Sequence, residues 1–522
     1  MRDDQETVSR RGFIRTAGVG AGAIGTLQAM SENESHAAVI SPQDPRYSTV
    51  VRGFNLRWVG NPQFVFVCGT PAAVLNAVRY GVEHHLRITV RSGGHCYEDF
   101  VYGNSGGIIV DLTPLNSVYL DPSNRLYCVE AGASLWNVYN TLYRTSGVTI
   151  PGGSCYSVCA GGHVTGGGYG LLSRLHGLTV DYLHAVEIVH VRHDGEVKIT
   201  VASADSSDPF YQDILWGNQG GGGGNFGIVT RFWFRDLPAA PSWALLQTLA
   251  WDWDGFTWSQ FLSLVQAYGQ FWEAHAQPGD PSAGLFSLLH LTQNAGQGQQ
   301  IAITTQSVGT DRSLLDSYTQ AITDGLPPGK ALRVPVGYHN YLATGSSEIQ
   351  QLPWLLATQT LNSSGPNRMF KNKSAYMIKA FPEQQIETIW KYLTEKANNN
   401  PAGLLQVDSY GAAINAIAPH TTAIPQRSSC MKLQYQIYWT DAGETQSNLD
   451  WIRAFSNDMY GPSGPLPDGT MDGCYVNYPD TDLAQWQYLY YKGNYPRLQR
   501  VKSEWDPLNV FNHKQSIEPA HL

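Results

Sequence analysis

Apolar residues between positions 60 and 115 recur with two different spacings. Residues 64–67 read Phe-Val-Phe-Val and predict a short buried strand, whereas the apolar positions of 71–84 have helical spacing behind an initial proline. Further buried strands are predicted at 88–90 and 107–112. A strand, a helix and two more strands in this order are typical of an α/β unit.

The chain continues in the same way to about residue 238, with more strands and one clear helix. Two of the strands flank Asp194-Gly195, a dipeptide that favours a tight hairpin turn. The predicted elements are a strand at 126–131, a helix at 135–145, and hairpin strands at 185–191 and 197–201.

The pattern changes after residue 238, where two prolines precede a Trp-rich stretch. Beyond it, alternating and helical spacings follow one another without a fixed repeat, which predicts a domain on an antiparallel sheet. We therefore expect a first domain at 38–238, an inserted domain at 239–469, and a C-terminal segment, 470–522, that returns to the first domain. In the inserted domain, strands are predicted at 284–291, 299–305, 404–410 and 432–439, and helices at 256–275, 311–324 and 382–398.

Glycine is unusually frequent and is concentrated in two predicted loops. The 522 residues include 53 glycines, about one residue in ten, where ~7% is usual. Eight of them lie in 151–170 and seven in 217–227. There is no Gly-X-Y period, so collagen is excluded, and the glycines instead indicate tight turns or a backbone that approaches a ligand closely.

The overall composition excludes several classes of protein. Hydrophobic residues make up 42% of the chain and charged residues 15%, which predicts a buried core and excludes disorder for most of the length. No apolar run reaches the ~18 residues of a membrane span. The net charge of −9 argues against a nucleic-acid partner. Seven cysteines are too few for a disulfide scaffold, and their number is odd.

The N-terminus resembles a twin-arginine signal peptide. Arg10-Arg11 is followed by a phenylalanine and then by an uncharged stretch rich in Ala and Gly. Residues 35–37, Ser-His-Ala, offer a cleavage site, so we expect residues 1–37 to be removed and the mature chain to start near Ala38. This predicts a secreted or extracytoplasmic protein that the twin-arginine machinery exports after folding. The alternative is a chance arginine pair on an N-terminal arm.

The first motif with chemical meaning is Arg91-Ser92-Gly93-Gly94-His95, directly after a predicted strand. Successive small residues expose backbone N–H groups, which can form an anion-binding nest suited to a diphosphate. The GxGxxG fingerprint between strand and helix is missing here, so a nicotinamide dinucleotide site is not indicated.

The glycine-rich segment 151–170 also contains Cys155, Cys159 and His163. Together with His95 these side chains could ligate a metal ion, but no CxxC or HxH cluster accompanies them, and we predict no metal site. A Cys155–Cys159 disulfide is a second possibility. The third is a backbone laid flat against a large planar ligand.

Taken in order, these motifs resemble the berberine-bridge-enzyme-like flavin oxidases of the vanillyl-alcohol oxidase superfamily. The likeness is greatest to the branch that contains aclacinomycin oxidoreductase and the hexose oxidases of glycopeptide biosynthesis, and it covers nearly the whole mature chain. It implies an α+β fold, in which an FAD-binding domain of two α/β subdomains carries an inserted substrate domain. The matching motifs are at 91–95, 152–155, 161–170, 220–229, 472–479 and 506–517.

The resemblance implies FAD attached by two covalent bonds, through His95 to the 8α-methyl group and through Cys155 to C6. Two such bonds would fix the ring and raise its redox potential. His163 would lie at the N1–C2=O edge, where a donor or a cation would stabilise the reduced flavin; its alternative role is a loop hydrogen bond. Val158 falls at the oxygen gate, and this small side chain indicates access of O2. The other cofactor-binding residues implied are Arg91, Ser92, Gly93, Gly94, Cys96, Gly152, Gly153, Ser154, Gly161, Gly162, Gly166, Gly167, Tyr169, Gly227, Ile228, Val229, Asn477, Tyr478, Asn512 and Gln515.

Hydride removal from an alcohol requires a base for the hydroxyl proton. The resemblance implies Tyr475 first, Tyr169 second and Tyr478 third, and the tyrosine pKa of ~10 would have to be lowered by a cation or a second hydroxyl. In a strand at 474–478, Tyr475 and Tyr478 would point to opposite faces. For both to reach the flavin, the strand must end or bulge, which Pro479 permits.

The sequence thus predicts a secreted FAD-dependent oxidase. Its substrate would be an alcohol or hemiacetal carbon of a sugar or glycosylated natural product, with O2 reduced to H2O2. The alternatives are oxidation or ring closure of a phenol or amine, a dehydrogenase with another acceptor, and a non-catalytic lectin-like protein. Trp251, Trp253 and Trp272 either line a sugar-stacking surface or belong to the core. The substrate, the pairing of the other cysteines and the oligomeric state are not encoded in any motif.

Overall fold

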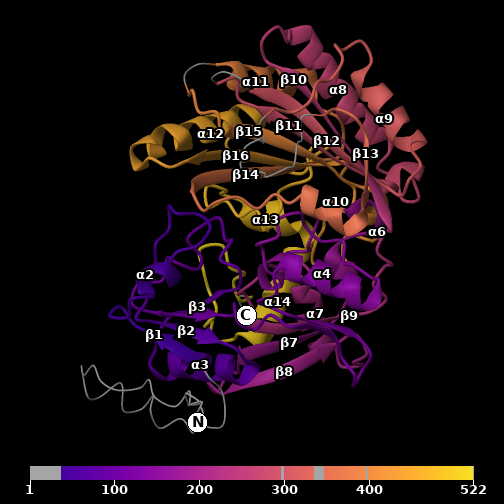
Figure 1. Cartoon of the computed structure of the whole chain (residues 1–522). Helices are drawn as coiled ribbons and strands as arrows, with labels where there is room; N and C mark the ends of the chain where they lie inside the picture. Colours follow the sequence, from indigo (N-terminus) through magenta and orange to yellow (C-terminus); the bar gives the residue numbers. More distant parts are fainter. Residues whose placement is uncertain (1–36, 296–298, 334–345, 396–397, 521–522) are drawn as a thin grey trace, which may run out of the picture.

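The computed structural model describes residues 37–295, 299–333, 346–395 and 398–520. Two small sheets form the lower part of the molecule in Figure 1, and one large sheet with its helices forms the upper part. The predicted arginine pair and the first two residues of the predicted cleavage site lie outside the described residues, and Ala37 is the first residue of strand β1. None of the helices in the described ranges combines the length and the apolar character that a membrane span requires.

The first sheet confirms the predicted α/β unit. Its strand order is β1-β2-β4-β3, and β2, β4 and β3 run parallel. The connecting helix α3 begins at Pro71, because the Thr70 side chain accepts a hydrogen bond from the N–H of Ala73 and the proline fits the first turn. The elements are β1 (Ala37–Ile40), α2 (Tyr47–Val50), β2 (Phe64–Cys68), α3 (Pro71–Glu83), β3 (Ile88–Arg91) and β4 (Ile108–Asp111).

The second sheet is antiparallel, with the order β5-β6-β9-β7-β8, and it contains the predicted hairpin. The two glycine-rich segments were predicted to be loops, but each contains some helix. The first contains the short helix α5, and the second begins inside α7. The elements are β5 (Val118–Leu120), β6 (Tyr127–Glu130), α4 (Leu135–Ser146), α5 (Ala160–Thr165), α6 (Ser173–His176), β7 (Leu183–Val191), β8 (Val197–Ser203), α7 (Pro209–Asn218) and β9 (Ile228–Phe234).

The third sheet has seven strands in the order β13-β10-β12-β11-β15-β16-β14, and every pairing in it is antiparallel. The Trp-rich stretch that marked the predicted boundary begins with strand β10, which the sequence pattern did not predict. Strand β14 was not predicted either. The elements are β10 (Trp243–Asp252), α8 (Trp258–Ala274), β11 (Leu285–Thr292), β12 (Gln300–Val308), α9 (Ser313–Thr323), β13 (Gln350–Pro353), α10 (Trp354–Thr360), β14 (Met369–Met377), α11 (Glu383–Thr394), β15 (Gly403–Ser409), β16 (Met431–Trp439) and α12 (Thr445–Tyr460).

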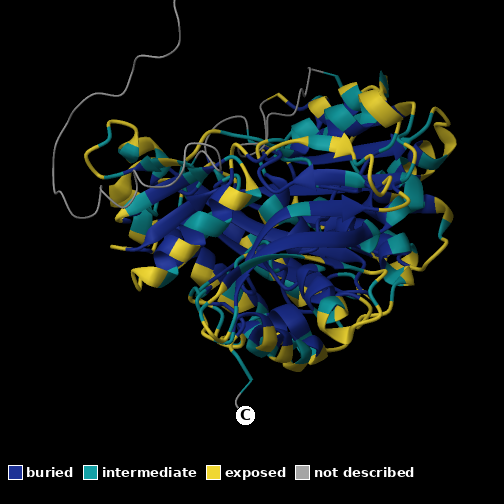
Figure 2. Ribbon diagram, turned by 90° about the horizontal axis from the view of Figure 1, so that it is seen from below, coloured by how far each residue is buried: buried dark blue, intermediate teal, exposed yellow. Residues whose placement is uncertain are grey.

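The two faces of the large sheet have different neighbours. Helices α8, α9, α11 and α12 cover the outer face, where the odd-numbered apolar residues of β15 and β16 join one hydrophobic core. Trp251, Trp253 and Trp272 are buried in that core, which decides between their two expected roles. The inner face is turned toward the two small sheets, and it is equally buried (Figure 2).

The C-terminal segment contacts the first part of the molecule. Helices α13 (Trp486–Tyr491) and α14 (Tyr495–Trp505) precede a bridge between Phe511 and Ile88, which lies at the start of β3. Residues 474–478 form no strand. They turn back on themselves, because the N–H of Tyr478 donates to the carbonyl of Tyr475 at 2.9 Å. A tight turn, and not an extended strand, therefore lies between the small sheets and the large sheet.

Candidate active site

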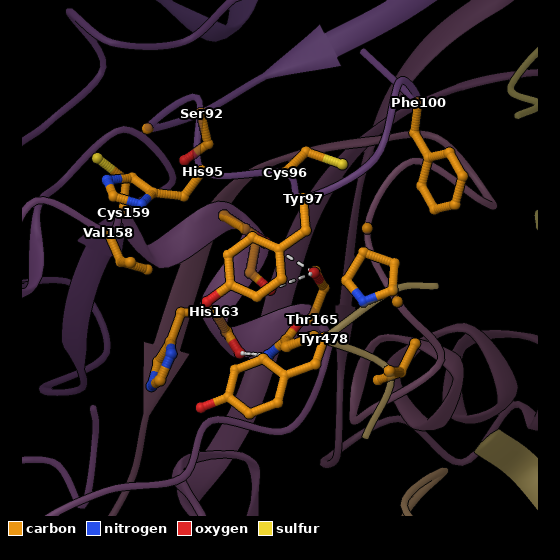
Figure 3. A pocket seen from close by; sticks show the side chains of 18 of the residues that line it. Ser92, His95, Cys96, Tyr97, Phe100, Val158, Cys159, His163, Thr165 and Tyr478 are labelled. Atoms are coloured by element: carbon orange, nitrogen blue, oxygen red, sulfur yellow. Dashed lines mark hydrogen bonds between the residues drawn. The ribbon is translucent and has the colours of Figure 1, made fainter. Parts of the chain in front are cut away.

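A cavity of about 340 Å³ lies between the glycine-rich segments and the inner face of the large sheet. Its walls come from the end of β3, from the 153–170 segment, from the loop before β9, from β11, β15 and β16, and from the 475–479 turn. Figure 3 shows side chains from several of these segments pointing into one space. Residues far apart in the sequence are thus brought to a single site.

The floor of the cavity is built from closely packed backbone. A Cβ atom on Gly93 would lie 2.9 Å from the backbone nitrogen of Cys159, so the 91–95 motif packs closely against the 151–170 segment only because Gly93 has no side chain. The hydroxyl of Ser92 and the N–H of Gly161 both donate to the carbonyl of Ala131, at 2.7 and 2.8 Å, which joins the two segments through a common acceptor. At Gly162, by contrast, a Cβ would meet no protein atom within 4 Å. Gly162 lines the cavity, so its missing side chain leaves room for a flat ligand.

His95 lies at the end of the β3 motif, with its imidazole stacked on the ring of Phe54 at 4.7 Å between centroids. Burial, together with the positive charge of Arg91, lowers the pKa of His95 to about 4. The imidazole is therefore neutral at pH 7. A neutral imidazole has a free nitrogen lone pair, which is the form able to bond to a carbon electrophile.

Cys155, in the 151–170 segment, lines the same cavity. Its Sγ lies 3.5 Å from the hydroxyl of Ser364 and 3.6 Å from that of Ser157. All seven cysteines are free thiols, so the Cys155–Cys159 disulfide considered from the sequence is not formed. In the described residues, no three His, Cys, Asp or Glu side chains come together in a way that could hold a metal ion.

His163 was expected either to act at the flavin edge as a donor or a cation, or to make a loop hydrogen bond. Burial lowers its pKa to about 4. Its Nε2 accepts a hydrogen bond from the N–H of Gly153 at 3.2 Å, which fixes a neutral tautomer with the proton on Nδ1. The neutral ring keeps an N–H donor at Nδ1, so the donor form of the expected role stays a prediction. The loop hydrogen bond that was the alternative is present.

The 475–478 turn carries two of the three candidate bases on one side. The rings of Tyr475 and Tyr478 are in edge-to-face contact at 5.0 Å between centroids, and Tyr478 stacks on Tyr97 at 5.6 Å (Figure 3). Asn477 donates through Nδ2 to the hydroxyl oxygen of Tyr475 at 3.0 Å. The turn thus meets the condition set by the sequence, since both tyrosines line the cavity.

Lys432 is a central residue of the site that sequence reasoning missed. It lies on the inner face of β16, where it forms a fully buried ion pair with Asp408 of β15. Its Nζ donates to the hydroxyl oxygen of Tyr478 at 3.1 Å and lies 5.6 Å from the ring centroid of Tyr475. The alternation of Lys432, Gln434 and Gln436 with apolar residues was the available signal, but such a pattern normally indicates a solvent-facing strand.

The electrostatics of the three tyrosines differ. Burial raises the pKa of Tyr475, and this rise is opposed by the hydrogen bond from Asn477, by the charge of Lys432 and by the N–H groups of Gly168 and Tyr169. Burial raises the pKa of Tyr478 well above the ordinary value. The hydroxyl of Tyr169 donates to the carbonyl of Ser409, so its proton is already engaged. Tyr475 is the phenol with most donors around its oxygen.

Most of the residues implied by the resemblance line the cavity. The exceptions, which do not line the cavity, are Gly152, Gly166 and Gly167. They allow close packing behind it instead, since a Cβ on Gly166 would clash with the side chain of Asn477. The cavity-lining residues that the motifs did not indicate include Tyr97, Gln406, Asp408, Lys432's neighbours Gln434 and Gln436, and Tyr438.

The shape and chemistry of this cavity fit FAD. The open space at Gly162, the run of glycines before β9 and the neutral His95 suit a large planar group that is contacted by backbone. The Berberine and berberine like family model matches residues 474–518, and the FAD binding domain model matches 62–200. A hexose oxidase of Chondrus crispus is 38% identical, over 92% of this chain and 94% of that protein.

The chain belongs to the berberine-bridge-enzyme-like family. It is an FAD-dependent oxidoreductase. The aclacinomycin-N/aclacinomycin-A oxidase of Streptomyces galilaeus is 35% identical over 98% of both chains. The crystal structure of a glycopeptide hexose oxidase complexed with teicoplanin superposes with a TM-score of 0.85, at 36% identity over 93% of this chain and 99% of that one. These likenesses confirm the fold class predicted from the motifs.

Proposed function

We propose that this berberine-bridge-enzyme-like protein is an oxidase of a CH–OH carbon on a sugar or a glycosylated natural product. The observation that carries the proposal is the meeting of His95, Cys155 and Tyr475 at one cavity, from three segments of the chain. Two of the similar proteins are named as hexose oxidases and a third as an oxidase of aclacinomycins. When bound, FAD supplies the hydride acceptor and passes both electrons to O2.

We infer that the cofactor is held covalently by His95 and Cys155. The neutral imidazole of His95 is the nucleophilic form, because its pKa of about 4 keeps it unprotonated at neutral pH. Cys155 stands on the other glycine-rich segment, at the same cavity. Bonds from two separate segments would keep the ring in place even when the cavity opens for a large substrate.

Tyr475 is the residue we propose to accept the proton of the substrate hydroxyl. Oxidation of CH–OH removes a hydride from carbon and a proton from oxygen, so a base is needed near the hydroxyl. A tyrosine acts as this base in its phenolate form and becomes a neutral phenol when it accepts the proton. Asn477, Lys432 and two backbone N–H groups stabilise a phenolate at Tyr475 against the effect of burial. The substrate leaves as a carbonyl compound or a lactone. The hydride and the hydroxyl proton together amount to two electrons and two protons, which convert O2 into H2O2.

Access of O2 and export complete the proposal. Val158 is partly buried and lines the cavity, and its small side chain leaves the approach to the ring open. Twin-arginine export suits a protein that acquires its cofactor before it leaves the cytoplasm. Replacement of Arg10-Arg11 by lysines should therefore leave flavin-containing protein inside the cell.

The proposed function is tested by screening purified holoenzyme against hexoses, disaccharides and aromatic glycosides under air. Peroxide release that matches substrate consumption supports the oxidase. Rapid reduction of an artificial dye without peroxide would make the protein a dehydrogenase. Turnover of phenols or amines in preference to all sugars would favour the ring-closing alternative, and the absence of any turnover would favour a non-catalytic protein.

A further inference from the structure

A short segment of the inserted domain is hydrogen-bonded to the chain around Cys155. The segment reads Asn-Ser-Ser at residues 362–364 and lies between α10 and β14. The hydroxyl of Ser363 is 3.0 Å from that of Ser154, and the N–H of Ser363 donates to the carbonyl of Ser154 at 3.2 Å. The next residue, Ser364, follows Cys155 by 209 positions in the sequence and yet contacts its sulfur.

The hydrogen bonds around Ser364 direct its proton toward that sulfur. The oxygen of Ser364 accepts from the N–H of Ser157 at 3.0 Å and from the hydroxyl of Ser157 at 3.2 Å. A hydroxyl oxygen has two lone pairs and one proton. Both lone pairs are then used, so the proton of Ser364 points away from Ser157. The sulfur of Cys155, 3.5 Å from the oxygen of Ser364, can accept it.

Ser157 lies almost as close to the sulfur, at 3.6 Å, but its own proton is engaged with Ser364. Of the two serines, Ser364 is therefore the donor to sulfur. Cys155 lines the cavity, whereas neither serine does. The hydroxyl of Ser364 thus reaches the sulfur without occupying the space in front of it.

A donor at this position changes the chemistry of the sulfur. The thiolate, and not the thiol, is the nucleophilic form of cysteine. A hydrogen bond donated to sulfur stabilises the thiolate relative to the thiol, because the donor interacts more strongly with the negative charge. The structure therefore places a thiolate-stabilising group behind the cysteine that faces the cavity.

We propose that Ser364 is a positioning residue that prepares Cys155 for its bond to the flavin. It donates to the thiolate and orients the sulfur toward the cavity. In the bonding step an S–C6 bond forms, the S–H and C6–H bonds break, and the two electrons and two protons released reduce one O2 to H2O2. The step rests on the covalent attachment that is part of the proposed function, and it makes the inserted domain a requirement for that attachment.

The groups that surround Cys155 keep their charge between about pH 7 and pH 9. Burial raises the pKa values of the neighbouring phenols well above the ordinary value and that of the neighbouring thiol to about 11. On the 91–95 motif, Arg91 is paired with Asp111 at 3.2 Å. The titratable side chains shown to interact electrostatically with Cys155 are Tyr97, Tyr438, Tyr478 and Cys159.

The test measures attachment of FAD, and not activity, in a His95→Ala background. In that background, flavin that survives acid denaturation is held by Cys155 alone, so the mass of the denatured chain gives the bonded fraction. Full-length protein is sampled at successive times after expression begins. Purified chains whose FAD is still unbonded are then incubated with FAD under air at about pH 7 and pH 9.

Four further substitutions are made in this background. S364A removes the donor hydroxyl, and S364T keeps it. S157A removes the exposed hydroxyl that directs the proton of Ser364. S363A is the matched control, because Ser363 is the neighbouring serine of the same segment and bonds to Ser154 instead of to the sulfur.

We expect S364T and S363A to bond FAD as fast as the His95→Ala chain does. S364A should be slower by about ten-fold or more at pH 7, the effect of losing a hydrogen bond to a charged group. An ordinary thiol loses its proton near pH ~8.5. At pH 9 the thiolate forms without a donor, so attachment in S364A should be about ten-fold faster than at pH 7. A defect of packing alone would not be corrected by pH.

Three results would overturn the role of Ser364. They are attachment in S364A as fast as in the His95→Ala chain, an equal loss in S363A, and a slow rate in S364A that does not increase at pH 9. Should S364A fail to fold, S157A decides, because it should slow attachment about three-fold at pH 7. An unchanged rate in S157A would then refute the proposal.

Failure of this proposal can be told apart from failure of the proposed oxidase. If the unmodified protein retains FAD after denaturation and the His95→Ala chain never does, Cys155 forms no bond and the role of Ser364 is overturned. The oxidase is tested separately, by peroxide release from a sugar with the unmodified enzyme. It stands when peroxide is released, whatever the state of Cys155.

Discussion

The side-chain amide of Asn477 donates to the hydroxyl oxygen of Tyr475 and to the carbonyl of His163, both at 3.0 Å. A single residue thereby connects the C-terminal turn to the helix α5 that follows the Cys155 segment. The tyrosine oxygen is held at a fixed position relative to the cavity floor. This link is the structural basis for choosing Tyr475 among three tyrosines that line the same cavity.

Replacement of Tyr475 by Phe should slow flavin reduction by a sugar substrate about 10²–10⁴-fold, the usual contribution of a general base. The measurement is the anaerobic reduction rate, followed through flavin absorbance in a stopped-flow instrument. Tyr169→Phe is the matched control and should lose much less, because its hydroxyl already donates to the carbonyl of Ser409. A larger loss in Tyr169→Phe or Tyr478→Phe than in Tyr475→Phe would assign the base to the other residue.

Removal of the Lys432 charge should move the acid limb of the kcat/KM profile to higher pH. The cation lowers the pKa of Tyr475, and a base with a higher pKa becomes active only at higher pH; a shift of about one pH unit or more is expected. Burial still raises the pKa of Tyr475 overall, so the rate of the unmodified enzyme should also increase with pH through neutrality. Lys432→Met alone would leave Asp408 buried without a counterion. The variant is therefore Lys432→Met with Asp408→Asn, and Asp408→Asn alone is the control. An unmoved profile would refute the role of Lys432.

The sequence predicted the FAD-binding part of this site better than the substrate-facing part. The glycine-rich segments could be found because close backbone packing requires glycine at fixed positions, and His95 could be found because the motif around it resembles that of a known family. Lys432 and Asp408 could not, because a polar residue at every second position of a strand predicts exposure to solvent. Only the packing of the large sheet onto the small ones buries that face, and such long-range packing has no local signature. Strand β10 was not predicted because its tryptophans were interpreted as the mark of a domain boundary.

A buried charge network joins the three parts of the chain and should make a large contribution to stability. Lys371 of β14 lies 2.5 Å from Glu98 and 2.6 Å from Asp480, and all three side chains are at most 2% exposed. Lys371→Met leaves two buried carboxylates with less compensation and should lower the free energy of unfolding by about 3–5 kcal/mol. Denaturant unfolding measures this. Adding Glu98→Gln should restore part of the loss, and a double variant as unstable as the single one would contradict the coupling.

Stability should fall in mild acid because several histidines are buried in the neutral form. Burial lowers the pKa of His163 to about 4, and burial with the nearby charges of Arg192 and Lys198 lowers that of His190 to about 4. Each ordinarily titrates near 6.5, so the unfolded chain binds protons first as the pH falls. The contribution of these histidines to the free energy of unfolding should therefore decrease between about pH 6.5 and pH 4. His163→Gln should flatten this slope, and an equal slope in the variant would contradict the assignment.

The most direct test of the central account is the mass of the denatured protein. If FAD is bonded to both His95 and Cys155, the intact unmodified protein should carry the mass of one FAD after acid precipitation, and the pellet should be yellow. His95→Ala and Cys155→Ala should each retain the flavin through the remaining bond, and the double variant should release it. A colourless pellet of the unmodified protein, with no added mass, would contradict the account.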